Sequence, residues 1–176
     1  MLLQFKMTEN TKYISYLVEQ ARKGSKSAFY RLFEINLAVL YPIAIRLTAN
    51  EETATKIIQE TILFALRNIS QARRDSTFSS WLKAITVREC INLHFSPASE
   101  THLGEGPDFI YNKDLLTEFD LAILRLPREP RYIIILYDFL KYSMTEISDM
   151  LSLGSPENVR VMIRLARKKI LGDVML

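Results

Sequence analysis

The sequence predicts an all-α fold made of two small helical domains joined by a flexible linker, the C-terminal one a helix-turn-helix domain. Three observations lead to this prediction. Apolar residues recur at the three-to-four-residue spacing of a helix over most of the chain. Hydrophobic residues make up 48% of the 176 residues and only five are glycine, which is typical of a packed helical protein. One stretch, residues 96–112, lacks that spacing and is rich in Pro, Gly, Ser and acidic residues, as linkers are.

The linker divides the chain into a domain of residues 1–95, the linker 96–112 and a domain of residues 113–176. Lys and Arg outnumber Asp and Glu in the N-terminal domain and in residues 141–176, whereas acidic residues predominate between them. No uninterrupted apolar run reaches the roughly 18 residues of a membrane span, and the apolar run at the N-terminus is too short for a signal peptide. We therefore expect a cytoplasmic protein without membrane insertion.

The N-terminal domain begins with two predicted helices. Tyr13, Leu17 and Ala21 share one face of the first, which we expect to end at Gly24. Ser25 is a suitable N-cap for the second. The apolar face of this second helix consists of Phe29, Leu32, Phe33, Leu37, Leu40, Tyr41, Ala44 and Ile45.

Two further helices are predicted before the linker. The third covers about residues 51–69, and the 3.6-residue period separates its apolar and polar sides. Its inner face holds Ala54, Ile57, Ile58, Ile62, Ala65 and Ile69, and its outer face holds Lys56, Gln59, Glu60, Leu63 and Arg67. The fourth begins near Ser76 with the apolar residues Phe78, Trp81, Leu82 and Ile85. Its apolar spacing weakens at Arg88, Glu89 and Asn92.

The C-terminal domain opens with a predicted helix whose apolar residues are Leu115, Leu116, Phe119, Leu121, Ala122 and Leu124. An intensely apolar run, residues 132–140, follows two prolines. Periodicity alone permits a strand or a buried helix there. We interpret the run as a helix because Pro130 suits a first helical turn and no partner strand is predicted elsewhere.

The last part of the chain predicts a helix-turn-helix. Ser143 and Glu146 have the spacing of a capping box, in which each side chain satisfies the other residue's backbone donor at a helix start. Residues 152–154 break this short helix. Ser155 and Pro156 then provide an N-cap and a first-turn proline for a second helix.

The second helix is amphipathic. Its apolar side holds Val159, Met162, Ile163, Ala166 and Ile170, and its polar side holds Glu157, Arg160, Arg164, Arg167 and Lys168. A basic face of this kind is often only a solvated surface. Because it follows a capped helix and a tight turn, we expect it to lie in the DNA major groove, where arginines bond phosphates and guanine edges.

These residues also resemble a known family. The series Leu126-Pro127 with Arg131, Ser143 with Glu146-Ile147, and residues 166–169 (Ala-Arg-Lys-Lys) resembles region four of the bacterial sigma factors of the extracytoplasmic-function group. Three parts of the N-terminal domain resemble successive parts of region two: Ala28-Phe29, Ala54 with Gln59-Glu60-Thr61, and Phe78 with Trp81-Leu82 and Ile85. The resemblance extends over about residues 14–170.

The resemblance implies three binding surfaces. The outer face of the third helix (Lys56, Gln59, Glu60, Leu63 and Arg67) would bind the largest subunit of core RNA polymerase, although an ordinary solvated face is the alternative. Minus-10 DNA would be held by Arg73, Arg74, Lys83 and Arg88, with Trp81 packing in the core. Minus-35 DNA would be contacted by Ser155, Glu157, Asn158, Arg160, Arg164, Arg167 and Lys168.

The sequence departs from the family pattern in three places. Residues 53–56 are Thr-Ala-Thr-Lys where the family usually carries acids, and residues 91–96 lack the usual basic ending of the fourth helix. Met162 and Leu165 stand where basic residues are frequent. These differences affect the expected strength of polymerase binding, minus-10 recognition and the promoter sequence that is read.

The predicted function is that of an alternative sigma factor, which binds core RNA polymerase and promoter DNA and has an anti-sigma factor as a further partner. Two alternatives are a sigma-like decoy that binds an anti-sigma regulator without initiating transcription, and a stand-alone helix-turn-helix regulator that dimerises on two half-sites. The sequence has no phosphate-binding glycine loop, metal-ligand cluster or nucleophile with a histidine partner, so we predict neither enzymatic activity nor a cofactor or metal.

Overall fold

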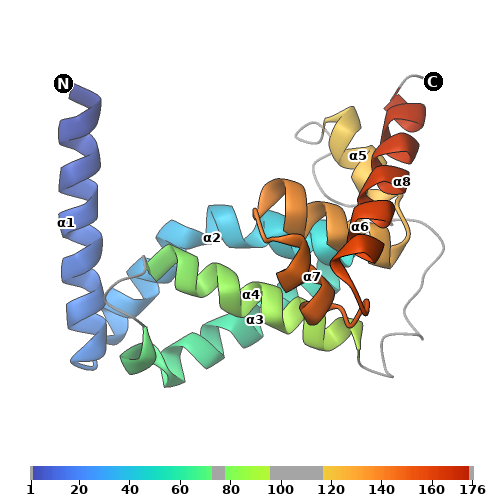
Figure 1. Ribbon diagram of the computed structural model, residues 1–176. Coiled ribbons are helices and arrows are strands. Elements are labelled where there is room, and N and C mark those ends of the chain that lie inside the picture. The colour runs from blue at the N-terminus through green and yellow to red at the C-terminus, as the bar shows by residue number, and fades with distance from the viewer. Residues whose placement is uncertain (1, 73–77, 96–116, 175–176) are drawn as a thin grey trace.

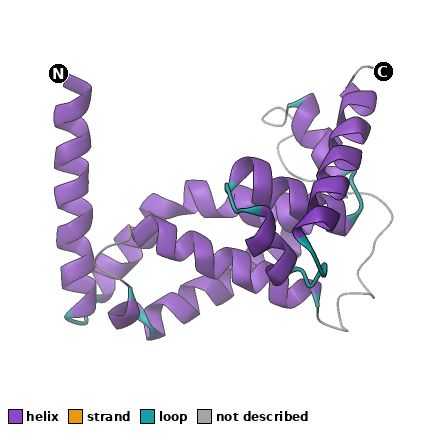
Figure 2. Ribbon diagram, in the orientation of Figure 1, coloured by secondary structure: helices purple, strands orange, loops and turns teal. Residues whose placement is uncertain are grey.

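The computed structural model describes residues 2–72, 78–95 and 117–174, and the regular elements within these ranges are all helical (Figure 1 and Figure 2). The predicted all-α fold class is confirmed. The predicted linker, residues 96–112, lies outside the described ranges.

Four helices form the N-terminal part. They are α1 (Leu2–Arg22), α2 (Lys26–Thr48), α3 (Glu51–Arg67) and α4 (Phe78–His94), with the short 3-10 helix η1 (Ile69–Gln71) after α3. Helix α2 packs against α1, α3 and α4 and is the central element of this part. Helix α1 stands beside one end of α2, and its N-terminal end points away from the other helices (Figure 1).

The first two helix boundaries are confirmed. Helix α1 ends at Arg22, and Gly24 follows in the left-handed region with φ of 94°, where a glycine avoids the steric cost of a Cβ atom. The Ser25 hydroxyl then accepts a hydrogen bond from the Ala28 N–H at 3.3 Å and caps α2. Helix α3 has an N-cap of the same kind at Asn50.

Helix α2 supplies much of the core. Leu32, Leu40, Ala44 and Leu47 are completely buried, but Leu37 is 39% exposed, so the prediction that Leu37 lies in the core is wrong. The reason is that α2 packs on helices to one side along this stretch and leaves the other side in solvent. Helix α2 is also long and apolar enough to cross a membrane, but half of its apolar window is buried inside the protein, as in a core helix.

Helix α4 continues as a regular helix to His94, beyond the point where its apolar spacing weakens in the sequence. Val87, Cys90 and Ile91 are buried in this C-terminal half. They share a side of α4 that differs from the side of Phe78, Leu82 and Ile85, because α4 is covered from more than one direction. Thr86 is also buried, and its hydroxyl donates to the Leu82 carbonyl at 3.0 Å.

The C-terminal part contains α5 (Glu118–Leu124), α6 (Arg128–Ile134), η4 (Ile135–Phe139), α7 (Met144–Met150) and α8 (Pro156–Val174). The apolar run is helical, as interpreted, and η4 is a π-helical turn that continues α6. The Leu140 N–H accordingly bonds the Ile135 carbonyl five residues earlier, at 3.0 Å. The side chains from Tyr132 to Leu136 are at most 2% exposed.

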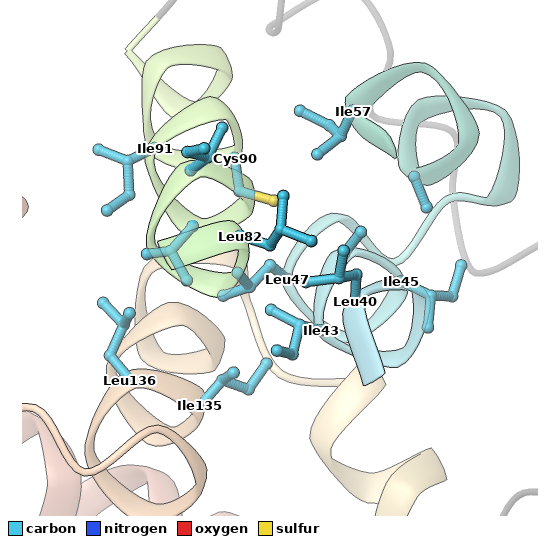
Figure 3. Close-up of a cluster of buried hydrophobic side chains, with 14 of the residues drawn as sticks. Leu40, Ile43, Ile45, Leu47, Ile57, Leu82, Cys90, Ile91, Ile135 and Leu136 are labelled. Carbon is cyan, nitrogen blue, oxygen red and sulfur yellow. The ribbon is translucent and has the colours of Figure 1, made fainter. Parts of the chain in front are cut away.

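The two parts of the molecule pack directly against each other. Helix α2 contacts α5, α6 and η4 as well as its own neighbours. Figure 3 shows Leu40 and Leu47 of α2, Cys90 of α4, and Ile135 and Leu136 of η4 in one buried cluster. The hydrophobic core is therefore continuous between the N-terminal and C-terminal parts.

Candidate nucleic-acid and protein interfaces

The capping box predicted at the start of α7 is present. The Ser143 hydroxyl accepts a hydrogen bond from the Glu146 N–H at 3.2 Å, while the Glu146 carboxylate accepts bonds from the Ser143 N–H and hydroxyl at 2.8 and 2.7 Å. These bonds from Ser143 favour the ionised carboxylate and lower the pKa of Glu146. The start of the first helix of the helix-turn-helix is thus fixed by two residues.

Loss of this cap gives a first testable prediction. Replacing Ser143 with alanine removes the hydroxyl that satisfies a backbone donor, and we expect the free energy of unfolding to fall by about 1 kcal/mol. Urea denaturation followed by circular dichroism measures the change. Thr145→Ala, at an exposed position in the same first turn, is the control and is expected to change the stability little. Equal losses in the two variants would show that the cap contributes nothing specific.

The turn between α7 and α8 is held by side chains of the second helix. Ser152 and Gly154 have left-handed backbones, with φ of 55° and 78°. The Ser155 hydroxyl accepts from the Asn158 N–H at 3.3 Å, which confirms Ser155 as the N-cap. The Asn158 amide in turn donates to the Leu153 carbonyl at 2.8 Å. Ser155 and Asn158, both predicted to contact DNA, therefore also define the geometry of the turn.

The inner face of α8 anchors the helix. Val159, Ile163, Ala166 and Ile170 are buried and Met162 is partly buried, as the period predicts. Helix α8 packs against α5, α6 and α7. Its orientation is therefore determined by the whole C-terminal part and not by the turn alone.

The outer face of α8 carries the predicted DNA-binding cations. Arg160, Arg164 and Lys168 are exposed, and Glu157 lies beside Arg160 with a nitrogen–oxygen distance of 3.6 Å. Both members of that pair are mostly exposed, so the pair holds Arg160 only weakly. Leu165 is 59% exposed on the same side. The face combines positive charge with apolar surface.

Arg167 is engaged within the protein. Its guanidinium forms an ion pair with Asp138 of η4, with Nε 3.2 Å from one carboxylate oxygen and Nη2 bonded to the other. It also lies 5.7 Å from the centre of the Tyr137 ring. The hydrogen bond to Asp138 raises the pKa of Arg167. Unlike Arg164 and Lys168, Arg167 would have to leave this pair before it could bond a phosphate.

The outer face of α3 is arranged as the sequence predicts. Lys56, Gln59, Glu60, Leu63 and Arg67 are all exposed and follow one another at helical spacing. On the opposite side, the hydroxyls of Thr61 in α3 and Thr86 in α4 are 3.4 Å apart in a buried position. The five exposed residues form one stripe, called the α3 stripe below.

Of the four residues predicted to bind minus-10 DNA, the structure describes two. Arg73 and Arg74 lie outside the described residues, and Lys83 is half-buried. Arg88 lies 4.0 Å from the centre of the Phe64 ring and bonds the Glu89 carboxylate at 2.9 Å. Trp81 is partly buried and packs on Phe78 with 5.6 Å between ring centres, in keeping with the predicted core position.

Sequence reasoning missed a set of polar residues between the two parts: Arg46, Asp120, Arg131 and Tyr132. Arg46 pairs with Asp120, and Arg131 and Tyr132 bond backbone carbonyls of the N-terminal part. Arg131 enters the sequence prediction only as one of the residues that resemble region four. The sequence contains no signal for the other three, because their partners are far away along the chain.

Models of two regions of one protein family match the chain. The model described as Sigma-70 region 2 matches residues 32–96, and the model described as Sigma-70, region 4 matches residues 116–170. The first range contains the α3 stripe and the second contains the helix-turn-helix. The two models thus match the two parts of the structure in chain order.

Two proteins with similar sequences are named as ECF RNA polymerase sigma factors. The chain is 29% identical over 153 residues to the ECF RNA polymerase sigma factor SigM of Mycobacterium tuberculosis, with 82% of this chain and 78% of SigM covered. It is 25% identical over 156 residues to the ECF RNA polymerase sigma factor SigW of Bacillus subtilis, with 77% of this chain and 83% of SigW covered.

Two solved structures have a similar fold. CnrH, solved in complex with the cytosolic domain of CnrY, has a TM-score of 0.54 and 22% identity, with 91% of this chain and 96% of CnrH covered. The sigma factor RpoE, solved with the anti-sigma factor NepR from Bartonella quintana, has a TM-score of 0.56 and 19% identity, with 84% and 97% covered. At these identities the likeness concerns the fold.

Proposed function

The chain belongs to the sigma-70 family, in its extracytoplasmic-function group, and we propose that, as an alternative sigma factor, it directs core RNA polymerase to promoters through the α3 stripe and the outer face of α8. The observation that carries this proposal is the position of the two exposed faces, one inside each matched region. A match to both regions favours this function over that of a stand-alone helix-turn-helix regulator.

Helix α8 is proposed to bind minus-35 DNA. Its outer face presents Arg160, Arg164 and Lys168 to solvent, where they can contact phosphates or guanine edges in the major groove. Glu157, at the start of the helix, can accept from cytosine. Arg167 joins this set if DNA displaces Asp138. Ser155 and Asn158, whose hydrogen bonds hold the turn, position the helix and complete the proposed site.

The α3 stripe is proposed to bind core polymerase. Gln59 and Glu60 lie at its centre, flanked by Leu63, which is 43% exposed. A mixture of apolar, amide and charged groups is the usual composition of a protein interface. Lys56 and Arg67 extend the stripe at its two ends.

Minus-10 DNA is proposed to bind along α4 and the residues before it. Lys83 and Arg88 would contribute cations from α4, together with Arg73 and Arg74, and Arg88 would exchange its contact with Glu89 for a phosphate. Strand opening needs no hydrolysis by the chain itself. A protein that binds one unpaired strand better than the duplex shifts the equilibrium towards the melted state.

The family is not generally enzymatic, and we propose no reaction, cofactor or metal for this chain. The proposed location is the cytoplasm, where core polymerase and promoter DNA are found. RpoE was solved with an anti-sigma factor, and we propose that an anti-sigma factor also regulates this chain. The proposed domain boundaries are residues 1–95 and 113–176.

Reconstituted transcription tests the proposed function. The purified chain, added to core polymerase and a library of promoter fragments, is expected to produce transcripts that are absent without it. Replacing Gln59 and Glu60 together with alanine is expected to weaken core binding at least tenfold, because both groups lie at the centre of the α3 stripe. Titration of fluorescently labelled core polymerase measures this affinity.

A matched control replaces a glutamate and a glutamine on other exposed surfaces. The variant Glu34→Ala plus Gln71→Ala changes the same residue types and the same charge and is expected to retain core binding. Equal weakening in both double variants would remove the α3 stripe from the proposal. Binding to core polymerase without transcription or strand opening from any promoter would instead identify the chain as a decoy.

A further inference from the structure

A carboxylate from η4 binds one of the cations of α8. The Arg167 guanidinium pairs with Asp138 through both Nε and Nη2, and Nε lies 3.2 Å from Oδ2 of the carboxylate. The ring of the neighbouring Tyr137 has its centre 5.7 Å from the same guanidinium. A pair with two points of contact fixes the direction of the side chain as well as its charge. Two consecutive residues of η4 therefore hold Arg167 in place.

Arg167 lies on the same side of α8 as the cations that we propose to contact DNA. Arg160, Arg164 and Arg167 are four and three residues apart, so their side chains follow one another along one flank of the helix. When the first two approach the backbone of a duplex, Arg167 also comes close to it. The Asp138 carboxylate comes with it, because 30% of that side chain is exposed beside the arginine.

The pair differs from the other cations of α8 in its net charge. Arg164 and Lys168 are exposed and each bring one positive charge to DNA, where binding to a phosphate releases counterions. Arg167 and Asp138 together bring none. A phosphate that replaced Asp138 would leave that carboxylate unpaired beside the negatively charged duplex, so the exchange gains little. Arg167 therefore adds little to sequence-independent affinity while Asp138 is present.

Asp138 is held more firmly than the other acid on this side of α8. Glu157 lies 3.6 Å from Arg160, and both side chains are about two-thirds exposed, so either can move away. Asp138 belongs to η4, whose residues Ile135 and Leu136 are buried in the core. The π-helical turn of η4 is an uncommon conformation that is often found at functional sites. The carboxylate consequently stays beside α8 when DNA approaches.

We propose that Asp138 limits the DNA affinity of the α8 surface by neutralising Arg167. This inference rests on the proposed function of α8. Phosphate contacts carry no sequence information, and a genome offers about 10⁶–10⁹ competing non-specific sites. Lower sequence-independent affinity keeps less of the chain on those sites. Asp138 thus sets how strongly the helix-turn-helix binds any duplex, without reading a base.

Asp138→Asn in the full-length chain tests the proposal. Asparagine has nearly the same shape as aspartate but no charge, so Arg167 becomes a cation without an acidic partner in η4. With a duplex of random sequence, the slope of log affinity against log KCl concentration should steepen by about 0.9, the contribution of one phosphate contact. Near 0.1 M KCl the affinity should rise up to about eightfold, which is that slope applied over the tenfold range to about 1 M. Fluorescence anisotropy measures both quantities.

Two further variants identify the pair as the cause. Arg167→Ala leaves Asp138 as an unpaired acid, so the slope should become shallower and the affinity should fall by a similar factor. Asp138→Asn combined with Arg167→Ala removes both charges and should return the slope and the affinity close to those of the wild type. A double variant that kept the increased affinity of Asp138→Asn would overturn the proposal, because the increase would not depend on Arg167.

Asp149→Asn is the matched control for charge. It makes the same substitution at an exposed position of α7, the other helix of the helix-turn-helix. The slope should change less than half as much as in Asp138→Asn. Circular dichroism checks that each variant is folded, as expected for the loss of a partly exposed ion pair.

The remaining outcomes are distinct. A lower affinity in Asp138→Asn would overturn the proposal, because Asp138 would then orient Arg167 towards DNA. An unchanged affinity, or an equal rise in Asp149→Asn, would also overturn it, since the pair would be remote from DNA or binding would follow total charge. The proposed function survives these results as long as the wild type binds the duplex. If no form of the chain binds duplex DNA at any salt concentration, the proposed DNA binding by α8 fails, and the role of Asp138 fails with it.

Discussion

Replacing Ile147 with alanine is expected to lower the free energy of unfolding by about 2–5 kcal/mol. Ile147 is completely buried in α7, and the structure shows α7 packed against both α8 and η4. Truncation removes buried apolar surface and leaves a cavity that a close-packed core fills only in part. Because domains are stable by only about 5–15 kcal/mol, the helix-turn-helix should lose a large part of its stability.

Guanidinium denaturation followed by circular dichroism measures this loss. Leu165→Ala is the matched control, because it removes a similar number of carbon atoms from a residue that is 59% exposed on α8. The control should change the free energy of unfolding by less than about 0.5 kcal/mol. A loss in Leu165→Ala as large as in Ile147→Ala would mean that the outer face of α8 is buried, in contradiction to the structure.

Removing two cations from the outer face of α8 should weaken DNA binding strongly. The double variant Arg164→Ala plus Lys168→Ala eliminates two exposed charges that we propose to contact phosphates. Each phosphate contact contributes about 0.9 to the slope of log affinity against log salt, so the slope should decrease by about 1.8. Near 0.1 M salt the affinity should fall on the order of 10- to 100-fold. Fluorescence anisotropy with duplex DNA over a series of KCl concentrations measures both quantities.

The control for this variant is Arg125→Ala plus Lys169→Ala. It removes the same charge from exposed positions of the C-terminal part, with Lys169 on a different side of α8 from Lys168. Its salt dependence should stay close to that of the wild type. If both double variants lose the same slope, binding follows total charge, and the outer face of α8 is not the DNA-binding surface.

Local features were predictable because their physical cause is local. The capping box of Ser143 and Glu146 lies within four residues, and the α3 stripe follows from the pitch of one helix. The helix in the apolar run of residues 132–140 could be distinguished from a strand by the proline before it and by the absence of a predicted strand partner. Leu37 was misplaced because periodicity shows which residues share a face but not how far a neighbouring helix covers it.

The sequence by itself determined the all-α class, the N-caps at Ser25, Ser143 and Ser155, and the faces of α3 and α8, since these depend on spacing within a turn or two of helix. Only the tertiary structure decided which cations are engaged and how the two parts meet. Arg167 and Arg88 have the same charge as their exposed neighbours, but folding brings Asp138 and Phe64 to them. Arg46 and Asp120 are 74 positions apart and Arg131 and Leu47 are 84 apart, and no local pattern encodes a contact over such separations. The way the two parts pack against each other is therefore visible only in the tertiary structure.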